Sequence, residues 1–270
     1  MTRRVGLCSY PKSGNTWVRF MIANMMEVER SIDYHNIDKI IPTGVPTLKA
    51  PEATLAGWEF YKTHLPIGEA ANIYDRVIYI ERDGFDALES YRWFLQKQHP
   101  KLFRSDVDFL LGHRRFYGYW GEHYNQEFDG VNSVHIVRYE DLKNDSRQEL
   151  NAVLEFLDVD VISQTRNLDM AILRSSRERM KALPGSAEFM KAANKSTNFV
   201  RRGESGKGLK YWTEAGFLSQ VMTQPGFLAS MKRFSYAYPE VPALLKKIGV
   251  RDSISFHARD IVRKVRKTLK

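Results

Sequence analysis

The stretch Val5-Gly6-Leu7-Cys8-Ser9-Tyr10-Pro11-Lys12-Ser13-Gly14-Asn15-Thr16-Trp17 decides the fold class of this chain. Its first five residues form a short apolar run that ends in a turn, a pattern typical of a buried strand. A helix is predicted to follow the turn, with Asn15 or Thr16 as its N-cap. The apolar positions of this helix recur at helical spacing and are Trp17, Val18, Met21, Ile22 and Met25.

A strand, a loop and a helix in this order are suited to bind an anion. The free N–H groups of the first helical turn point towards the loop, and the helix dipole favours negative charge there. Gly14 lets the backbone approach a phosphate closely, and Lys12 adds a positive charge. Further side-chain donors are Ser13, Asn15 and Thr16. The Walker order G-x-x-x-x-G-K-[ST] is not met, because the lysine precedes the glycine. We expect a phosphate-binding loop, and the alternative is a capped helix beside an exposed lysine.

Three more apolar runs extend the strand–helix pattern along the chain. They predict strands at Trp58–Thr63, Val77–Ile80 and Val134–Val137. Helices are predicted at about Asp86–Gln98 and around Leu150–Leu157, whereas Ser31–Gly57 carries three prolines and is expected to be mostly loop. The succession predicts an α/β fold in a single domain over residues 1–270. Its central, mostly parallel sheet is flanked by helices on both faces and carries a P-loop-like phosphate-binding loop.

The amino-acid composition limits the kinds of binding partner and the cellular compartment that we expect for this protein. The chain has 41 Lys and Arg against 32 Asp and Glu, a formal net charge of +9, which favours polyanionic partners such as nucleic acid, a membrane surface or a charged nucleotide. Cys8 is the only cysteine, so no intramolecular disulfide can form. No long apolar segment precedes Val5. We therefore expect a soluble protein of the cytoplasm.

The loop also carries a specific resemblance. Tyr10–Trp17 resembles the YPKSGTTW loop that binds the 5′-phosphosulfate in the cytosolic sulfotransferases, a family that uses 3′-phosphoadenylyl sulfate (PAPS) as donor. Asn15 stands where the family often has Thr, and it keeps a hydrogen-bonding side chain. The resemblance implies that Lys12 meets the bridging oxygen and the sulfuryl group and that Trp17 packs on adenine.

A second motif, Tyr61–Pro66, resembles the K-T-H-L-P segment of the same family. The resemblance implies that His64 is the general base and that Lys62 neutralises charge on the sulfuryl oxygens. An acceptor hydroxyl is a poor nucleophile until its proton is removed, and a neutral imidazole suits that task near pH 7. Taken alone, a histidine after a strand is more often a structural residue.

Three further segments resemble the nucleotide-binding parts of the family. Arg82 and Ser90, eight residues apart, hold the positions of its 3′-phosphate site, where the planar fork of arginine suits a phosphate. The alternative for Arg82 is an ion-pair cluster with its acidic neighbours Glu81 and Asp83. Tyr139, in a Y-E-D segment, is implied to contact the adenine region. A glycine-rich basic run is implied to fold over the nucleotide through Arg201, Arg202 and Gly203.

Two departures from the family pattern stand out. Ser175–Lys181 aligns loosely with T-S-F-x-x-M-K, which places Ser175 in the nucleotide site but puts Arg177 where an aromatic residue packs on adenine. A guanidinium can also stack on a base. After Gly206 the family usually continues D-W-K, whereas Lys207–Trp212 follows here. The segment around Thr213 also lacks the short dimerisation motif of animal members, so the oligomeric state stays open.

The resemblance implies transfer of the sulfuryl group of PAPS to an acceptor hydroxyl, with release of 3′,5′-adenosine bisphosphate. No metal is expected, because the seven histidines lack zinc-site spacing. The acceptor is open between a small molecule, a glycan and a lipid-linked hydroxyl. It is expected to be shaped by Ser31–Gly57, Phe116–Trp120 and Arg166–Ser196.

Two other classes of protein remain as alternatives. A P-loop nucleotide kinase would need a Walker lysine and an acidic magnesium ligand, and it would leave the Lys62–His64 motif unexplained. A basic binding protein would use the positive charge and the tail Arg251–Lys270, which predicts a basic amphipathic helix. That helix either packs on the domain or lies on an anionic membrane as a peripheral contact. No nucleic-acid-binding signature is present, so no nucleic-acid partner is expected.

Overall fold

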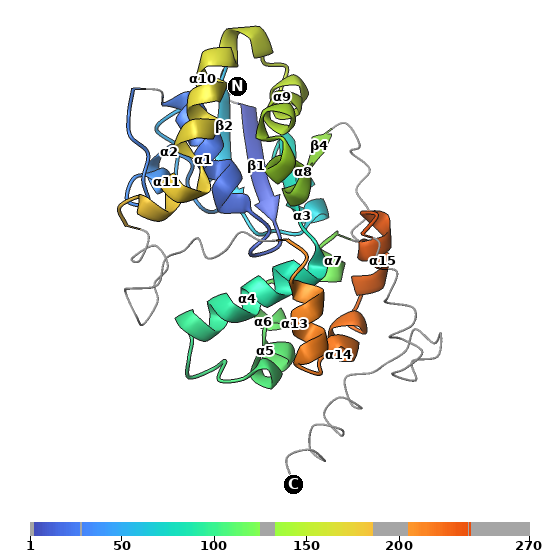
Figure 1. Ribbon diagram of the computed structural model, residues 1–270. Helices are drawn as coiled ribbons and strands as arrows, with labels where there is room; N and C mark the ends of the chain where they lie inside the picture. The colour runs from blue at the N-terminus through green and yellow to red at the C-terminus, as the bar shows by residue number, and fades with distance from the viewer. Residues whose placement is uncertain (1–2, 28, 125–132, 186–204, 237, 239–270) are drawn as a thin grey trace.

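Four parallel strands form the central sheet of the protein (Figure 1). They are β1 (Arg3–Ser9), β2 (Trp58–Thr63), β3 (Arg76–Glu81) and β4 (Val134–Arg138), in the order β2-β1-β3-β4. The computed structural model describes residues 3–27, 29–124, 133–185, 205–236 and 238. The central strands β1 and β3 are buried over five consecutive residues, which explains why their sequences read as continuous apolar runs.

Helices cover both faces of this sheet, as the sequence predicts. One face, with Val5, Leu7 and Ile78, packs against the first group of helices. This group comprises α1 (Asn15–Met26), α2 (Ile37–Ile40), α8 (Tyr139–Asn144), α9 (Ser146–Phe156), α10 (Val161–Arg174) and α11 (Arg177–Ala182). α10 packs directly on α1.

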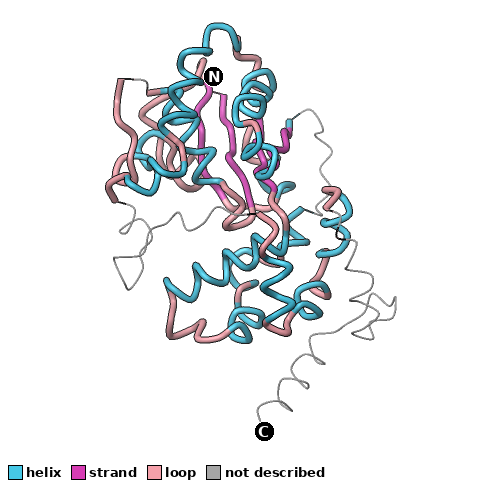
Figure 2. The backbone as a smooth tube through the Cα atoms, in the orientation of Figure 1, coloured by secondary structure: helices cyan, strands magenta, loops and turns pink. Residues whose placement is uncertain are grey.

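The other face, with Cys8, Val77 and Tyr79, packs against the second group. Its members are α3 (Ile67–Ala71), α4 (Gly84–Gln98), α5 (Asp106–Gly112), α7 (Trp120–Tyr124), α13 (Gly208–Glu214), α14 (Leu218–Met222) and α15 (Phe227–Arg233). The short helix α6 (Arg114–Tyr117) buries none of its residues. Most of this group lies beyond the carboxyl ends of the strands, where Figure 2 shows helices and loops without strands. The carboxyl edge of the sheet therefore faces α4 and α13.

The starts of two helices differ from the prediction. α1 begins at Asn15, but its N-cap position is Gly14 at φ +101°, and no side chain caps it. Asn15 instead turns inward and donates to the carbonyl of Leu7 at 2.8 Å, so the predicted capping role is wrong. α4 begins at Gly84, two residues before the predicted start, because the Asp83 side chain accepts from the backbone N–H of Asp86 at 3.0 Å and caps the helix there.

Some predictions fall outside the described residues. These are the roles of Arg201, Arg202 and Gly203, the helix predicted at Arg251–Lys270 and the end of the Arg166–Ser196 segment. Within the described residues, Ser31–Gly57 is mostly loop, as predicted, with the short helix α2 inside it. None of the described helices combines the length and the apolar character needed to cross a membrane.

Candidate active site

A cavity of about 1200 Å³ opens at the carboxyl ends of β1, β2 and β3, bordered by α4, α6 and α13. This is the position at which open α/β sheets bind their ligands. Predicted site residues from separate segments of the chain meet here. Those that line the cavity are Lys12, Gly14, Asn15, Thr16, Trp17, Lys62, His64, Arg82, Ser90 and Tyr139.

The loop after β1 has an unusual backbone at two positions. Lys12 and Gly14 adopt left-handed conformations, with φ of +69° and +101°. A Cβ at Gly14 would lie 2.6 Å from Cδ2 of Tyr139, so glycine also lets this ring pack directly on the loop. The ring of Trp17 meets Tyr139 edge-on at 5.8 Å, which makes an aromatic wall beside the loop. The wall is suited to an adenine ring.

Two predicted nucleotide ligands are not brought to the cavity by their side chains. Ser13 and Ser175 are both fully buried. The hydroxyl of Ser175 lies 3.2 Å from Nδ2 of Asn24, and its carbonyl accepts from the indole N–H of Trp17 at 2.9 Å. Ser175 thus holds Trp17 in place from behind. Its neighbour Arg177, whose position departs from the family pattern, does line the cavity.

His64 is held in one tautomer by its neighbours. Its Nδ1 lies 2.8 Å from the carbonyl oxygen of Ser9. A carbonyl only accepts hydrogen bonds, so Nδ1 carries the proton and Nε2 keeps its lone pair. Burial, together with the charge of Lys62, holds the pKa of His64 well below its usual range. The imidazole is therefore neutral at pH 7 and can accept a proton at Nε2.

A second histidine, which the sequence did not single out, supports His64 from the backbone side. His123 Nε2 lies 3.0 Å from the carbonyl oxygen of His64, and its Nδ1 contacts the hydroxyl of Tyr79. Burial lowers the pKa of His123 to about 4, so this ring is also neutral. The segment around His64 is thus fastened on both sides by hydrogen bonds.

The pKa of Lys62 is set by burial and by a nearby ion pair that sequence motifs could not reveal. Arg19 is completely buried in α1 and pairs with Asp38 at 2.5 Å. Burial and the charge of Arg19 lower the pKa of Lys62 to about 8, while Asp38 acts in the opposite direction. Lys62 therefore stays mostly protonated at pH 7 and can stabilise negative charge in the cavity.

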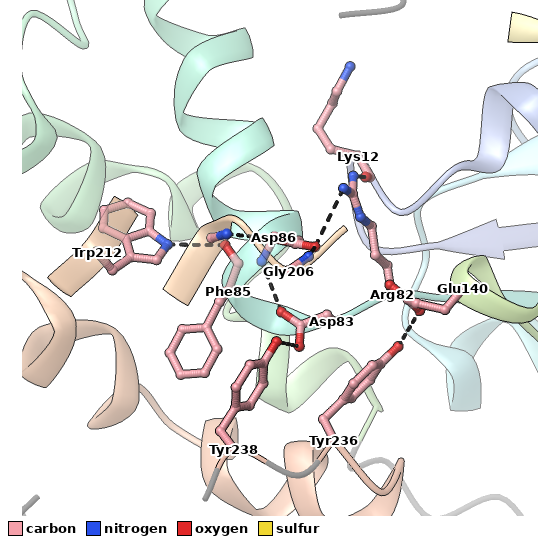
Figure 3. A network of polar contacts seen from close by, with 11 residues as sticks. Lys12, Arg82, Asp83, Phe85, Asp86, Glu140, Gly206, Trp212, Tyr236 and Tyr238 are labelled. Atoms are coloured by element: carbon pink, nitrogen blue, oxygen red, sulfur yellow. Dashed lines mark hydrogen bonds and ion pairs between the residues drawn. The ribbon is translucent and has the colours of Figure 1, made fainter. Parts of the chain in front are cut away.

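Arg82 connects the loop after β1 to the start of α4 (Figure 3). Its Nη1 donates to the carbonyl oxygen of Lys12 at 3.1 Å, and its guanidinium stacks over the ring of Tyr139 at 4.4 Å. The acidic partner that the structure gives it is Asp86, at 3.8 Å. Its sequence neighbours Glu81 and Asp83 bond to Tyr236 and Tyr238, respectively. The ion-pair alternative for Arg82 thus involves a different carboxylate from those expected.

The aromatic stretch Phe116–Trp120 divides between the cavity and the core. Phe116 and Tyr117 line the cavity, and the ring of Tyr117 lies 5.1 Å from that of His64. Trp120 is fully buried and packs on Phe227 at 5.1 Å. Only the first part of the stretch can meet an acceptor, as can Tyr34, Asp38 and Thr43 from the Ser31–Gly57 loop.

Fold and cavity together define a P-loop-like α/β protein with a cavity at the carboxyl edge of its sheet, bordered by a loop and helix start of the kind that suits an anion. Residues 2–216 match the family model described as a sulfotransferase domain, and the chain belongs to this family.

Relatives and solved structures agree with this membership. Sulfotransferase 1A1 of Bos taurus is 28% identical over 200 residues, which are 66% of this chain and 66% of that protein. Sulfotransferase 1E1 of Rattus norvegicus is 28% identical over 199 residues, 65% of each chain. The chain thus spans just under two thirds of the length of these relatives.

Among solved structures, mouse sulfotransferase SULT7A1 complexed with PAP superposes with a TM-score of 0.57 at 20% identity, covering 88% of this chain and 90% of that one. Retinol dehydratase in a complex with retinol and PAP gives 0.58 at 15% identity, covering 81% and 79%. These structures share the fold.

Beneath the site, a buried carboxyl is expected to make stability depend on pH. The Tyr236 hydroxyl lies 2.9 Å from Oε2 of Glu81 and 2.7 Å from Oε2 of Glu140. One hydroxyl proton serves only one of them, so a second negative charge at this position is disfavoured. Burial raises the pKa of Glu81 to about 8, although Arg138, whose Nε lies 3.6 Å from Oε2 of Glu81, acts in the opposite direction.

The sign of the effect follows from proton uptake. Between the ordinary glutamate pKa of 4.5 and the folded value of about 8, the folded state binds one more proton at Glu81 than the unfolded state. The free energy of unfolding therefore falls as the pH rises through this interval. We expect Glu81→Gln, whose amide mimics the protonated carboxyl, to weaken this fall and to raise Tm above wild type at pH 8. Calorimetry at pH 6, 7 and 8 measures it, and parallel Tm curves for both proteins would contradict the assignment.

Proposed function

We propose that this protein transfers the sulfuryl group of PAPS to a hydroxyl of an acceptor and releases 3′,5′-adenosine bisphosphate. The observation that carries the proposal is the convergence of Lys12, Lys62, His64, Arg82 and Ser90 on one cavity within a sulfotransferase domain. The solved structures described above contain PAP, which is the same compound as 3′,5′-adenosine bisphosphate, the nucleotide that remains after transfer.

The basic side chains and the aromatic wall of the cavity support PAPS as the donor. In our proposal the loop Lys12–Thr16 holds the 5′-phosphosulfate, and Arg82 with Ser90 holds the 3′-phosphate. Trp17 and Tyr139 form the wall for adenine. Arg201, Arg202 and Gly203 would add to the 3′-phosphate site, and Arg177 would meet the base. The cavity of about 1200 Å³ leaves room for an acceptor beside the nucleotide.

The reaction needs one proton transfer and one displacement at sulfur. His64 Nε2 takes the proton of the acceptor hydroxyl as the hydroxyl oxygen bonds to sulfur. The bond between sulfur and the bridging oxygen breaks, and its electron pair stays on the 5′-phosphate. Lys12 neutralises this leaving oxygen, and Lys62 neutralises the sulfuryl oxygens in the transition state.

The acceptor side of the cavity is aromatic. Phe94, Phe116 and Tyr117 line it, and the Lys12 ammonium lies 4.6 Å from the centre of the Phe94 ring. We propose a small-molecule acceptor whose apolar body packs on these rings while its hydroxyl points to His64. A glycan or a lipid-linked alcohol would be an alternative outcome of an acceptor screen.

Nucleotide binding and transfer test the function directly. A ligand that binds only the folded state stabilises it by about 2.7 kcal/mol at a hundredfold excess over Kd. We therefore expect 3′,5′-adenosine bisphosphate to raise Tm by several degrees and radiolabelled PAPS to sulfate at least one member of a panel of phenols, sterols, glycans and lipid alcohols. A larger shift with ATP and magnesium would favour a kinase. No shift at millimolar bisphosphate, together with no transfer, would refute the proposal.

A further inference from the structure

Asp86 is the acid that ties together the elements around Arg82. It lies in the first turn of α4 and is 3% exposed. Its Oδ2 accepts from the backbone N–H of Gly206 at 2.7 Å, and its Oδ1 accepts from that of Gly208 at 2.6 Å. Its Oδ2 also lies 3.8 Å from Nη2 of Arg82 (Figure 3). One buried carboxylate thus contacts both the start of α13 and the guanidinium.

The same guanidinium reaches the loop after β1. Arg82 donates to the carbonyl oxygen of Lys12, a residue whose left-handed backbone costs a non-glycine residue about 1–2 kcal/mol. Its position between the ring of Tyr139 and the carboxylate of Asp86 leaves the guanidinium plane little freedom. The contacts of Asp86 therefore extend through Arg82 to the backbone of the predicted sulfuryl-binding lysine.

We propose that Asp86 is a positioning residue for recognition of the 3′-phosphate, acting through the orientation of Arg82. Its carboxylate lines the cavity, but it is negative and already accepts from the Gly206 and Gly208 N–H groups, so it is not itself a phosphate ligand. The inference rests on the proposed function, because it takes a nucleotide with a 3′-phosphate as the ligand. An arginine that is already oriented loses less side-chain entropy when it binds a phosphate. Removal of the Asp86 charge should therefore weaken the 3′-phosphate contact selectively.

The packing of α13 on α4 does not depend on Asp86 alone. The indole N–H of Trp212 donates to the carbonyl of Phe85 at 3.1 Å. A Cβ at Gly208 would lie 2.2 Å from the carbonyl carbon of Phe85, which shows how closely the two backbones approach. An asparagine at position 86 can still accept one of the two backbone N–H groups, and the Trp212 bond and the close backbone approach also hold α13 against α4. Asp86→Asn should therefore keep the fold while it removes the charge that faces Arg82. This separation makes a positioning role distinguishable from a structural one.

The test compares two buried acids of the same turn in the full chain. Asp86→Asn is measured against Asp83→Asn, which removes the charge of a residue that caps α4 and accepts from Tyr238. Calorimetric titrations with 3′,5′-adenosine bisphosphate and with 5′-AMP report binding with and without the 3′-phosphate. We expect Asp86→Asn to weaken bisphosphate binding roughly tenfold and 5′-AMP binding less than about twofold, with a higher KM for PAPS and a smaller change in kcat. Asp83→Asn should leave both the affinity for the bisphosphate relative to 5′-AMP and the KM for PAPS relative to kcat unchanged.

Two more variants keep the result decisive. Asp86→Glu retains the charge and should recover part of the bisphosphate affinity. Asp86→Ser, whose hydroxyl can still accept one backbone N–H, serves as a second neutral variant if Asp86→Asn does not fold. Equal weakening of both nucleotides in the folded neutral variants would overturn the positioning role. A wild type that binds the bisphosphate no better than 5′-AMP would instead refute the proposed function.

Discussion

Replacement of His64 by alanine is expected to lower the rate of sulfuryl transfer by roughly 10²–10⁴-fold, the usual effect of removing a general acid–base group. Binding of 3′,5′-adenosine bisphosphate should change little, because the proposed nucleotide contacts come from the loop after β1 and from Arg82 and Ser90. The expected signature is therefore a loss in kcat with nearly unchanged nucleotide affinity. Radiolabelled transfer and calorimetric titration measure the two quantities separately.

The size of this effect follows from the way His64 is held. The Ser9 carbonyl fixes the proton on Nδ1, so Nε2 is the atom with the free lone pair. Burial and the nearby charge of Lys62 keep the pKa of the ring low, and the base is ready in its neutral form at pH 7. No protonated fraction has to be removed before it can act.

A matched control for His64 exists elsewhere in the chain. His113 is fully buried, its Nδ1 lies 2.9 Å from the Phe109 carbonyl as that of His64 does from the Ser9 carbonyl, and burial lowers its pKa to about 4. It is not among the residues that line the cavity. His113→Ala is expected to lower stability while keeping kcat of the folded fraction. If His64→Ala turns over as fast as wild type, the base assignment is wrong.

The main features of the fold could be predicted because they depend on local patterns. The continuous apolar run of β3 indicates a strand buried on both faces, and the structure covers both faces with helices. The site residues Lys12, His64 and Arg82 follow the ends of three strands, and parallel strands bring these ends to one edge. Here proximity in space follows from topology, so the prediction needed no knowledge of side-chain contacts.

The supporting contacts could not be predicted, because they join residues that are distant in sequence and depend on side-chain direction. The indole of Trp17 donates to the carbonyl of Ser175, 158 residues away, and the N–H of Gly208 reaches Asp86 across 122 residues. The sequence does not show whether a serine in a nucleotide-binding motif, such as Ser13 or Ser175, turns its hydroxyl towards the ligand or towards the core. The inward turn of Asn15 escaped prediction for the same reason.

Trp212→Ala is expected to be the most destabilising of the changes considered, at about 3–5 kcal/mol. The side chain is fully buried in α13 and stacks on Phe109 with ring centres 6.1 Å apart. Its loss would leave a cavity between α13 and the helices beneath it. It would also leave the Phe85 carbonyl without its indole donor, which adds to the cost.

A graded series separates packing from hydrogen bonding at this position. Trp212→Phe keeps a ring against Phe109 but loses the donor to Phe85, so its cost should lie well below that of alanine. Ile162→Ala, at a side chain 84% exposed, should change stability by less than about 0.5 kcal/mol. Urea denaturation gives these values if the m-value is unchanged.

Because α13 begins at the backbone that Asp86 holds beside Arg82, saturating 3′,5′-adenosine bisphosphate should restore part of the stability lost in Trp212→Ala. A loss below about 1 kcal/mol for alanine would mean that α13 is not fastened to α4 through this indole.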